Sequence, residues 1–320
     1  MMRWLILIAS FCVWLTCMTV VYIQYSPHES KGGATPGTEA SLNAIFDEQA
    51  QPIHAWRIFI DLQRLKSAAA DPDNTGAATP GETHAAWNGV NELGLLKVGE
   101  FEDLLKRKHE SRVEQTTTMN IKIPKETGVQ WLEIIEKIQY KSWADVGIER
   151  GLETFNSTFK IRVNTPSGVM DLEANSMGSR ESDAFSVTQV VFQGGKPLFQ
   201  HIERIPVEGK AAPTISLIPF QDNPNIKDGY TFEISMLDMS MDIKKEAKPK
   251  MVPMKITCSG PKKIRHNGAD VPVFEARSTD GTARAWYSAD GVVVKQSYLI
   301  AGVLEVMLVK IDPKELRHRD

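Results

Sequence analysis

The sequence has few cysteines and no excess of charge of one sign. Three cysteines occur in 320 residues, and Cys12 and Cys17 lie in an apolar run near the amino terminus. Cys258 is alone in the remaining chain, so no intramolecular disulfide forms there and the fold depends on a hydrophobic core. Cys258 alternates with Met254 and Ile256, a pattern typical of a buried strand face. A net charge of -3 argues against nucleic acid as the main partner.

The sequence also lacks the short motifs of common catalytic sites. It contains no Gly-x-Ser-x-Gly, no phosphate-binding loop, no Gly-x-Gly-x-x-Gly and no His-Glu-x-x-His. Its seven histidines are scattered along the chain. We therefore assign no catalytic or cofactor-binding residue from the sequence. An enzyme whose residues converge only in three dimensions stays an alternative.

One stretch resembles a calcium-binding loop of the EF-hand kind. Such a loop places oxygen ligands at its positions one, three, five, nine and twelve, with glycine at six. The residues at these ligand positions are Asp71, Asp73, Thr75, Thr79 and Glu82. Threonine at position five removes a carboxylate, and residues 79–82 also form a capping box with proline at the first helical position. We favour the cap and turn interpretation and keep calcium as the alternative.

An almost uninterrupted apolar run extends from Trp4 to Ile23. At about 1.5 Å per residue a helix of this length covers roughly 30 Å, enough to cross a hydrocarbon core. We expect a membrane anchor over 1–25 that contacts lipid through 4–23, and then a polar linker over 26–42. The run exceeds the apolar region of a signal peptide, so we favour an uncleaved anchor over a cleaved signal. The bulk of the chain is then extracytoplasmic, and periplasmic in a bacterium.

Helical spacing predicts a helical region over 43–115. Apolar residues at helical intervals follow Pro52 as far as Ala70, and further patterns run from Pro80 to Leu93 and over 101–105. A capping-box pattern at Thr127 and Gln130 predicts another helix that continues through Ile138.

Short alternating runs separated by turn residues dominate the rest of the chain. They predict an antiparallel β-rich region over 116–320, a half-barrel or sandwich, with two sub-lobes near 116–210 and 211–320. The expected fold class is therefore α+β, comprising a transmembrane helix, a helical neck and a β-rich ectodomain. The clearest local feature is Asp290-Gly291 between two alternating runs, which predicts a hairpin with a type I′ turn. Lys295 and Ser297 are expected on the polar face of that hairpin.

The carboxy-terminal runs, including 285–295 with its Trp286 and closing Asp290-Gly291, resemble the closing hairpins of bacterial periplasmic half-barrels. These are lipoprotein carriers of the LolA kind and uncharacterised envelope β-domains, and the resemblance covers 214–311. It implies an envelope location and a curved sheet that shelters an apolar ligand. We expect a membrane-anchored envelope protein that binds a partner protein or a lipid-like ligand without catalysis. A structural subunit of an envelope secretion or transport assembly is the second alternative.

Overall fold

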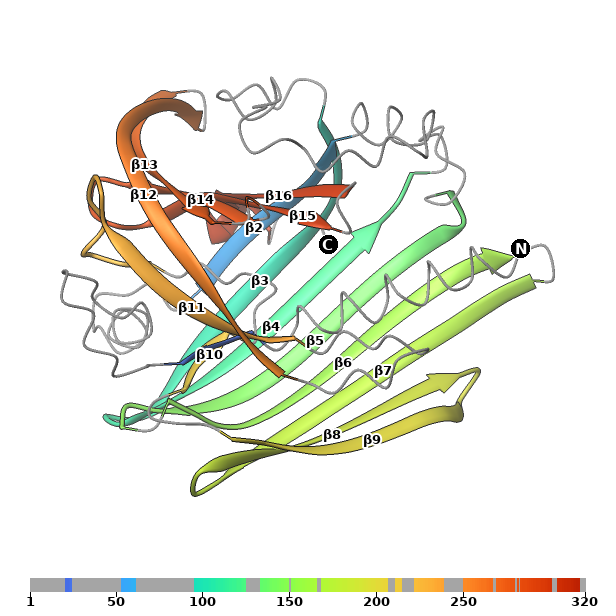
Figure 1. Cartoon of the computed structure of the whole chain (residues 1–320). Helices are drawn as coiled ribbons and strands as arrows, with labels where there is room; N and C mark the ends of the chain where they lie inside the picture. Colours follow the sequence, from blue (N-terminus) through green and yellow to red (C-terminus); the bar gives the residue numbers. More distant parts are fainter. Residues whose placement is uncertain are drawn as a thin grey trace.

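The fold is a single, strongly curled antiparallel sheet (Figure 1). The computed structural model describes residues 21–24, 53–61, 95–124, 133–149, 151–165, 168–206, 211–214, 222–238, 250–266, 269–279, 281, 283–300 and 304–316. Fourteen strands follow one another in the order β11-β12-β13-β14-β15-β16-β2-β3-β4-β5-β6-β7-β8-β9, and β1 and β10 lie off this path. Since β16 pairs with β2, a strand from the first quarter of the chain and the last strand lie side by side in the middle of the sheet.

The elements have these bounds: β1 Val21–Gln24, β2 Ile53–Asp61, β3 Leu95–His109, β4 Arg112–Lys122, β5 Ile135–Gly147, β6 Gly151–Thr165, β7 Gly168–Glu181, β8 Ala184–Gln193, β9 Lys196–Pro206, β10 Ala211–Thr214, β11 Thr231–Asp238, β12 Lys250–His266, β13 Ala269–Ser278, β14 Ala283–Ser288, β15 Val293–Ile300, β16 Leu304–Ile311, and the 3-10 helix η1 Pro313–Glu315. Within these ranges the structure has no α-helical element, so the fold is mainly antiparallel β.

Strands β3 to β8 have one buried and one solvated face, as strict alternation requires. Their inner faces contribute to one large core that also includes Phe232 and Cys258 from the opposite end of the sheet. Their outer faces are polar and are bridged by cross-strand ion pairs such as Arg162–Asp171, at 2.8 Å, and Lys160–Glu173, at 2.9 Å. The curl of the sheet therefore brings both of its ends onto a shared core.

A β-bulge in β12 reverses the strand's alternation. Ile256 and Cys258 face the main core, but after the irregularity between Ser259 and Lys262 the next buried residue, Ile264, packs in a separate cluster with Val273. The prediction that Cys258 is a buried strand residue is confirmed, and burial raises the pKa of its thiol to about 12.

The helical region predicted over 43–115 is wrong wherever the structure describes it. β2 occupies 53–61, inside the expected helix from Pro52 to Ala70, and it is buried on both faces with Ile58 in the main core and Phe59 in another cluster. A short apolar run of this kind fits a doubly buried strand as well as a helix. The expected helix over 80–93 lies outside the described residues.

The helix predicted over 101–105 is wrong, and the helix predicted through Ile138 is wrong from Ile135 onward, while its residues 125–132 lie outside the described residues. In β3, Phe101 is buried and Leu104 is exposed, so their spacing of three does not mark one face. In β5, Ile135 and Ile138 do share the core face, because a bulge between Ile135 and Lys137 shifts the alternation by one residue. A bulge inserts one extra residue and converts a spacing of two into a spacing of three.

The predicted hairpin at Asp290-Gly291 is confirmed, but its turn is not type I′. Only Gly291 has a positive φ, of 79°, and its N–H donates to the carbonyl of Ser288 at 3.0 Å. This geometry is a type I turn followed by a left-handed glycine, the three-residue alternative. Lys295 and Ser297 are buried rather than solvated, because β15 is covered on both faces.

The amino-terminal predictions fall mostly outside the described residues. No described helix has the length and apolar character needed to cross a bilayer. Residues 21–24 form β1, which pairs antiparallel with β10, so the expected helix does not extend through Ile23. Residues 1–20, the linker over 26–42 and the calcium-like loop over 71–82 are not described.

Candidate functional site: a polar row across the inner face

A line of polar side chains crosses the inner face of the sheet at right angles to the strands. Each member lies directly opposite the next in the strand register, from β3 to β8. The members, called the polar row below, are Asp103, Thr117, Ser142, Ser157, Ser176 and Gln189. At roughly 4.8 Å per strand the row extends over about 24 Å. All six side chains are buried, with exposures of 6% or less.

Several polar atoms in and beside this row have no hydrogen-bond partner within the part of the chain that the structure describes. They are the hydroxyl oxygens of Ser142 and Ser176, the side-chain nitrogen of Gln189 and the side-chain oxygen of Gln115. Buried polar groups in folded proteins are nearly always hydrogen-bonded, and an unsatisfied one costs about 1–3 kcal/mol. Four of these atoms lie in or beside one register line, which makes this line the candidate site.

Apolar side chains border the polar row on both sides. The register line two residues along each strand contains buried aromatic and aliphatic residues: Phe101, Met119, Tyr140, Phe159 and Ala174. The line on the other side continues from Gln115 through small and apolar residues: Ala144, Phe155, Gly178 and Val187. The inner face therefore has a narrow, buried polar stripe between two largely apolar lines of side chains.

Asp103 is the ionisable member of the polar row. Burial raises the pKa of its carboxyl to about 7, although hydrogen bonds from Thr117 and Gln115 act in the opposite direction. Thr117 donates its hydroxyl proton to Asp103 across the β3–β4 pair. The row has no lysine or arginine, so it offers neutral donors and acceptors and, at one end, a carboxyl that is partly protonated near neutral pH.

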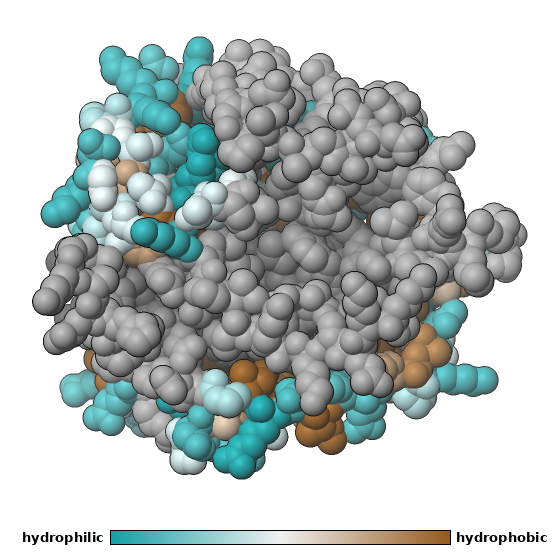
Figure 2. All heavy atoms as spheres, viewed as in Figure 1, coloured by the Kyte–Doolittle hydropathy of each residue, from teal (hydrophilic) through white to brown (hydrophobic). Residues whose placement is uncertain are grey.

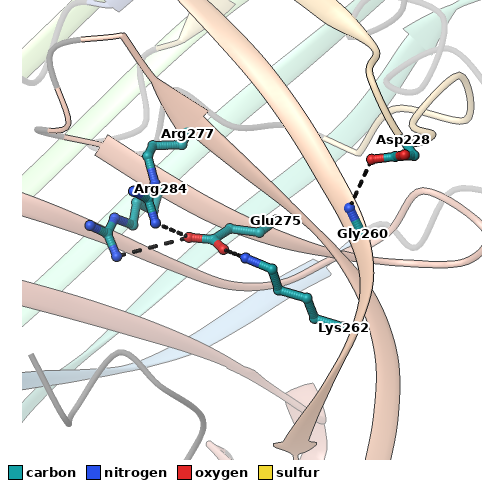
Figure 3. A network of polar contacts seen from close by, with 6 residues as sticks. All are labelled: Asp228, Gly260, Lys262, Glu275, Arg277 and Arg284. Atoms are coloured by element: carbon teal, nitrogen blue, oxygen red, sulfur yellow. Dashed lines mark hydrogen bonds and ion pairs between the residues drawn. The ribbon is translucent and has the colours of Figure 1, made fainter. Parts of the chain in front are cut away.

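A second polar cluster lies on the opposite face of the sheet, at β12–β14 (Figure 3). Glu275 is buried and is surrounded by Lys262, by Arg277 at 2.9 Å and by Arg284 at 3.9 Å. Burial raises the pKa of Glu275, but hydrogen bonds from Lys262 and Arg277 outweigh it, and the net pKa lies below the usual value. The bulge in β12 turns Lys262 toward this face. We interpret this cluster as structural, since one carboxylate already joins three strands.

The sequence-based site predictions and the observed site do not coincide. The calcium-like loop lies outside the described residues, and among those that are described no group of three or more metal-ligating side chains occurs. The polar row was not predicted. The sequence pattern that marks its members is a serine or glutamine flanked, two positions before and two positions after, by apolar or small residues. This pattern occurs at Ser142, Ser157, Ser176 and Gln189. Only the strand register shows that these separate patterns form one line.

Comparison with known proteins identifies no family. No protein-family model and no curated protein matches the chain. The crystal structure of a β-barrel-like protein of the domain of unknown function DUF1849 from Brucella abortus aligns with it at a TM-score of 0.35 and 6% identity. The alignment covers 82% of this chain and 97% of that protein. It is a distant structural likeness of two large β-sheet proteins.

Proposed function

We propose that the chain binds an elongated, lipid-like amphipathic ligand across the inner face of β3–β8 and does not catalyse a reaction on it. The observation that supports this proposal is the polar row with its unpartnered buried atoms, bordered by apolar side chains. An amphipathic ligand matches both the polar row and the apolar lines beside it. Its polar atoms would bond the hydroxyls, and its apolar parts would contact the flanking aromatic residues.

The charge of the polar row favours a ligand with neutral polar groups at the row. Hydroxyl and carboxamide side chains bond ester, amide or hydroxyl groups, and the row supplies no cation to balance a phosphate or carboxylate. An anionic group beside Asp103 would also meet a second negative charge above pH 7. We therefore infer that any anionic headgroup of the ligand lies away from this row.

Binding is favoured over catalysis because the polar atoms do not converge. A catalytic centre needs a nucleophile, a base and a charge-stabilising donor within hydrogen-bond reach of one point. Successive members of the polar row instead stand on successive strands, roughly 4.8 Å apart. This arrangement suits contact along the length of a ligand.

An envelope location is part of the proposal and rests on the apolar run from Trp4 and on the resemblance of 214–311 to periplasmic carriers. Protease treatment of intact spheroplasts tests it. The ectodomain is expected to be degraded from outside, and a chain fully protected by an intact inner membrane would contradict this location.

The binding proposal is tested with two matched double variants of the full-length protein. Ser142→Ala with Ser176→Ala removes two unpartnered hydroxyls from the polar row. Ser179→Ala with Ser186→Ala removes a cross-strand serine pair from the outer face of β7 and β8 and serves as the control. Each purified protein is extracted with organic solvent, and the extract is analysed by mass spectrometry.

The expected result is a co-purifying amphiphile whose amount per protein falls roughly tenfold in the row variant, about what two net hydrogen bonds contribute. The outer-face control is expected to retain the wild-type amount. Recovery of no such compound with the wild type, or equal recovery with both variants, would overturn the proposal.

A further inference from the structure

Gln115 lies beside the polar row with one hydrogen-bond acceptor unused. It stands on β4 two residues before Thr117, so both side chains are on the inner face, and it is 3% exposed. Its amide and the hydroxyl of Thr117 both donate to the carboxyl of Asp103. Its side-chain oxygen has no partner among the described residues. The protein therefore satisfies one half of this amide and leaves the other half unsatisfied.

The bond to Asp103 fixes the direction of the Gln115 amide. Above pH 7 the carboxyl of Asp103 is ionised and only accepts hydrogen bonds, so the amide nitrogen of Gln115 faces it and the amide oxygen points elsewhere. A carbonyl oxygen also only accepts. The group that completes the hydrogen bonding of Gln115 has to donate a proton, as a hydroxyl or an amide N–H does and an ester oxygen does not.

A second unpartnered group lies diagonally across the β4–β5 pair. Ser142 is directly opposite Thr117, and Ala144 is directly opposite Gln115. Gln115 and Ser142 are therefore diagonal neighbours, with backbones roughly 7–8 Å apart. The hydroxyl of Ser142 has no partner among the described residues, and it can donate as well as accept. A single ligand group that donates to Gln115 and accepts from Ser142 would satisfy both side chains.

A line of apolar side chains leads from this point to the last strand of the sheet. It passes from Tyr140 through Phe159, Ala174 and Val191 to Phe199 on β9. Phe199 is 40% exposed, and Figure 2 shows hydrophobic residues on the lower surface, where Figure 1 places β7 to β9. From β5 to β9 the line covers about 19 Å. It offers apolar contacts to the chain of a ligand whose polar group lies at β4 and β5.

We propose that the polar group of the ligand between Gln115 and Ser142 both donates and accepts hydrogen bonds. The ligand is then an amphiphile with an amide or a free hydroxyl at this point, rather than one whose polar groups are all esters. This inference rests on the binding function proposed above and narrows it to one class of ligand. An ester satisfies Ser142 but leaves the oxygen of Gln115 buried without a donor, which weakens its binding.

Two probes that differ only at the donor test this ligand class. N-methyllauramide has an N–H where methyl laurate has an ester oxygen, and the two acyl chains are identical. Delipidated full-length protein is equilibrated at pH 8 with an equimolar mixture of the probes and separated from unbound probe. Mass spectrometry of the extract then gives the ratio of bound amide to bound ester.

Gln115→Met keeps the length of the side chain and removes its acceptor. We expect the ratio to fall about five- to tenfold below that of the wild type, which is the effect of roughly one net hydrogen bond. Gln115→Asn keeps the amide but withdraws it by one methylene group, and it is expected to lower the ratio as well. Ser142→Ala is the matched control, because serine bonds the carbonyl oxygen of either probe. It is expected to lower both bound amounts and to leave their ratio unchanged.

The possible outcomes separate this inference from the binding function. A wild-type ratio equal to that of both Gln115 variants would overturn the ligand class and leave the binding function standing. A ratio that falls as far in Ser142→Ala as in Gln115→Met would also overturn it, because Gln115 would then not distinguish the probes. Wild-type protein that retains neither probe would instead contradict the binding function itself. Circular dichroism and retention of methyl laurate verify that the Gln115 variants are folded.

Discussion

Thr117 donates a hydrogen bond from its hydroxyl to the carboxylate of Asp103 on the neighbouring strand, and both side chains are buried. This pair forms one end of the polar row that crosses six strands. Within the described residues Thr117 and Asp103 satisfy each other, and Ser157 donates to the backbone carbonyl of Ser176, whereas the hydroxyls of Ser142 and Ser176 have no partner. The effect on stability of removing a partnered hydroxyl can therefore be compared with that of removing an unpartnered one.

The first prediction concerns the pH dependence that Asp103 imparts to stability. Burial raises the pKa of its carboxyl from 3.8 to about 7 in the folded protein. Between these values the folded protein holds a proton that the unfolded chain has lost, so the contribution to the free energy of unfolding falls as pH rises. It is fully present below pH 3.8 and lost above about pH 7. Asp103→Asn removes this titration.

The variant is therefore expected to gain stability relative to wild type as pH rises from 4 to 8, by up to roughly 4 kcal/mol. Urea unfolding across this range measures the difference. A stability difference that does not change with pH would show that the buried carboxyl titrates normally.

The second prediction separates a partnered from an unpartnered hydroxyl. Thr117→Val removes the hydrogen bond to Asp103 and leaves a buried carboxyl with one donor fewer, so we expect a loss of about 1–3 kcal/mol. Ser176→Ala removes a hydroxyl that has no partner, so the ligand-free protein is expected to keep its stability or gain up to about 1 kcal/mol. Both values come from denaturant unfolding of delipidated protein. A large loss for Ser176→Ala would mean that the hydroxyl has an internal partner.

The third prediction concerns Gly291 in the β14–β15 turn. Its φ is +79°, and an added Cβ would lie 2.1 Å from the carbonyl oxygen of Asn223. Gly291→Ala is expected to cost about 2–4 kcal/mol, because backbone strain and a backbone clash add. Gly194→Ala is the control, with φ of +54° and no atom within 4 Å of an added Cβ. Thermal unfolding should show a clearly smaller loss for it, about 1 kcal/mol. Equal losses would mean that the Asn223 contact adjusts freely.

The fourth prediction concerns the carboxylate that joins β12, β13 and β14. Glu275→Gln leaves Lys262, Arg277 and Arg284 close together without a negative charge, and we expect a loss of about 3 kcal/mol at pH 7. Asp171→Asn breaks an exposed pair with Arg162 and is expected to cost less than about 1 kcal/mol. Because the pKa of Glu275 is lowered, its stabilisation is lost as pH falls below the usual range of a glutamate. A cost equal to that of the surface pair would contradict this role.

Local patterns were sufficient where strands are solvated on one face. Alternation predicted the β-rich region over 116–320 that contains β6 to β9, because a polar outer face makes a period of two visible. The same reasoning failed in β2, which is buried on both faces, and in β5, where a bulge moves Ile138 onto the core face. In both places the sequence contains a helix-like spacing that only sheet packing explains.

The sequence by itself determined that the region over 116–320 is β-rich and that its stability depends on a core, because it has a single cysteine beyond the apolar run and many alternating segments. The tertiary structure decided which residues belong together. Ser142, Ser157 and Ser176 are separated by turns and are unremarkable individually, and they form one line because each hairpin fixes its strands in a register that keeps them on the inner face. Register depends on turns, bulges and shared core contacts between distant residues, and these act only when the whole sheet has formed.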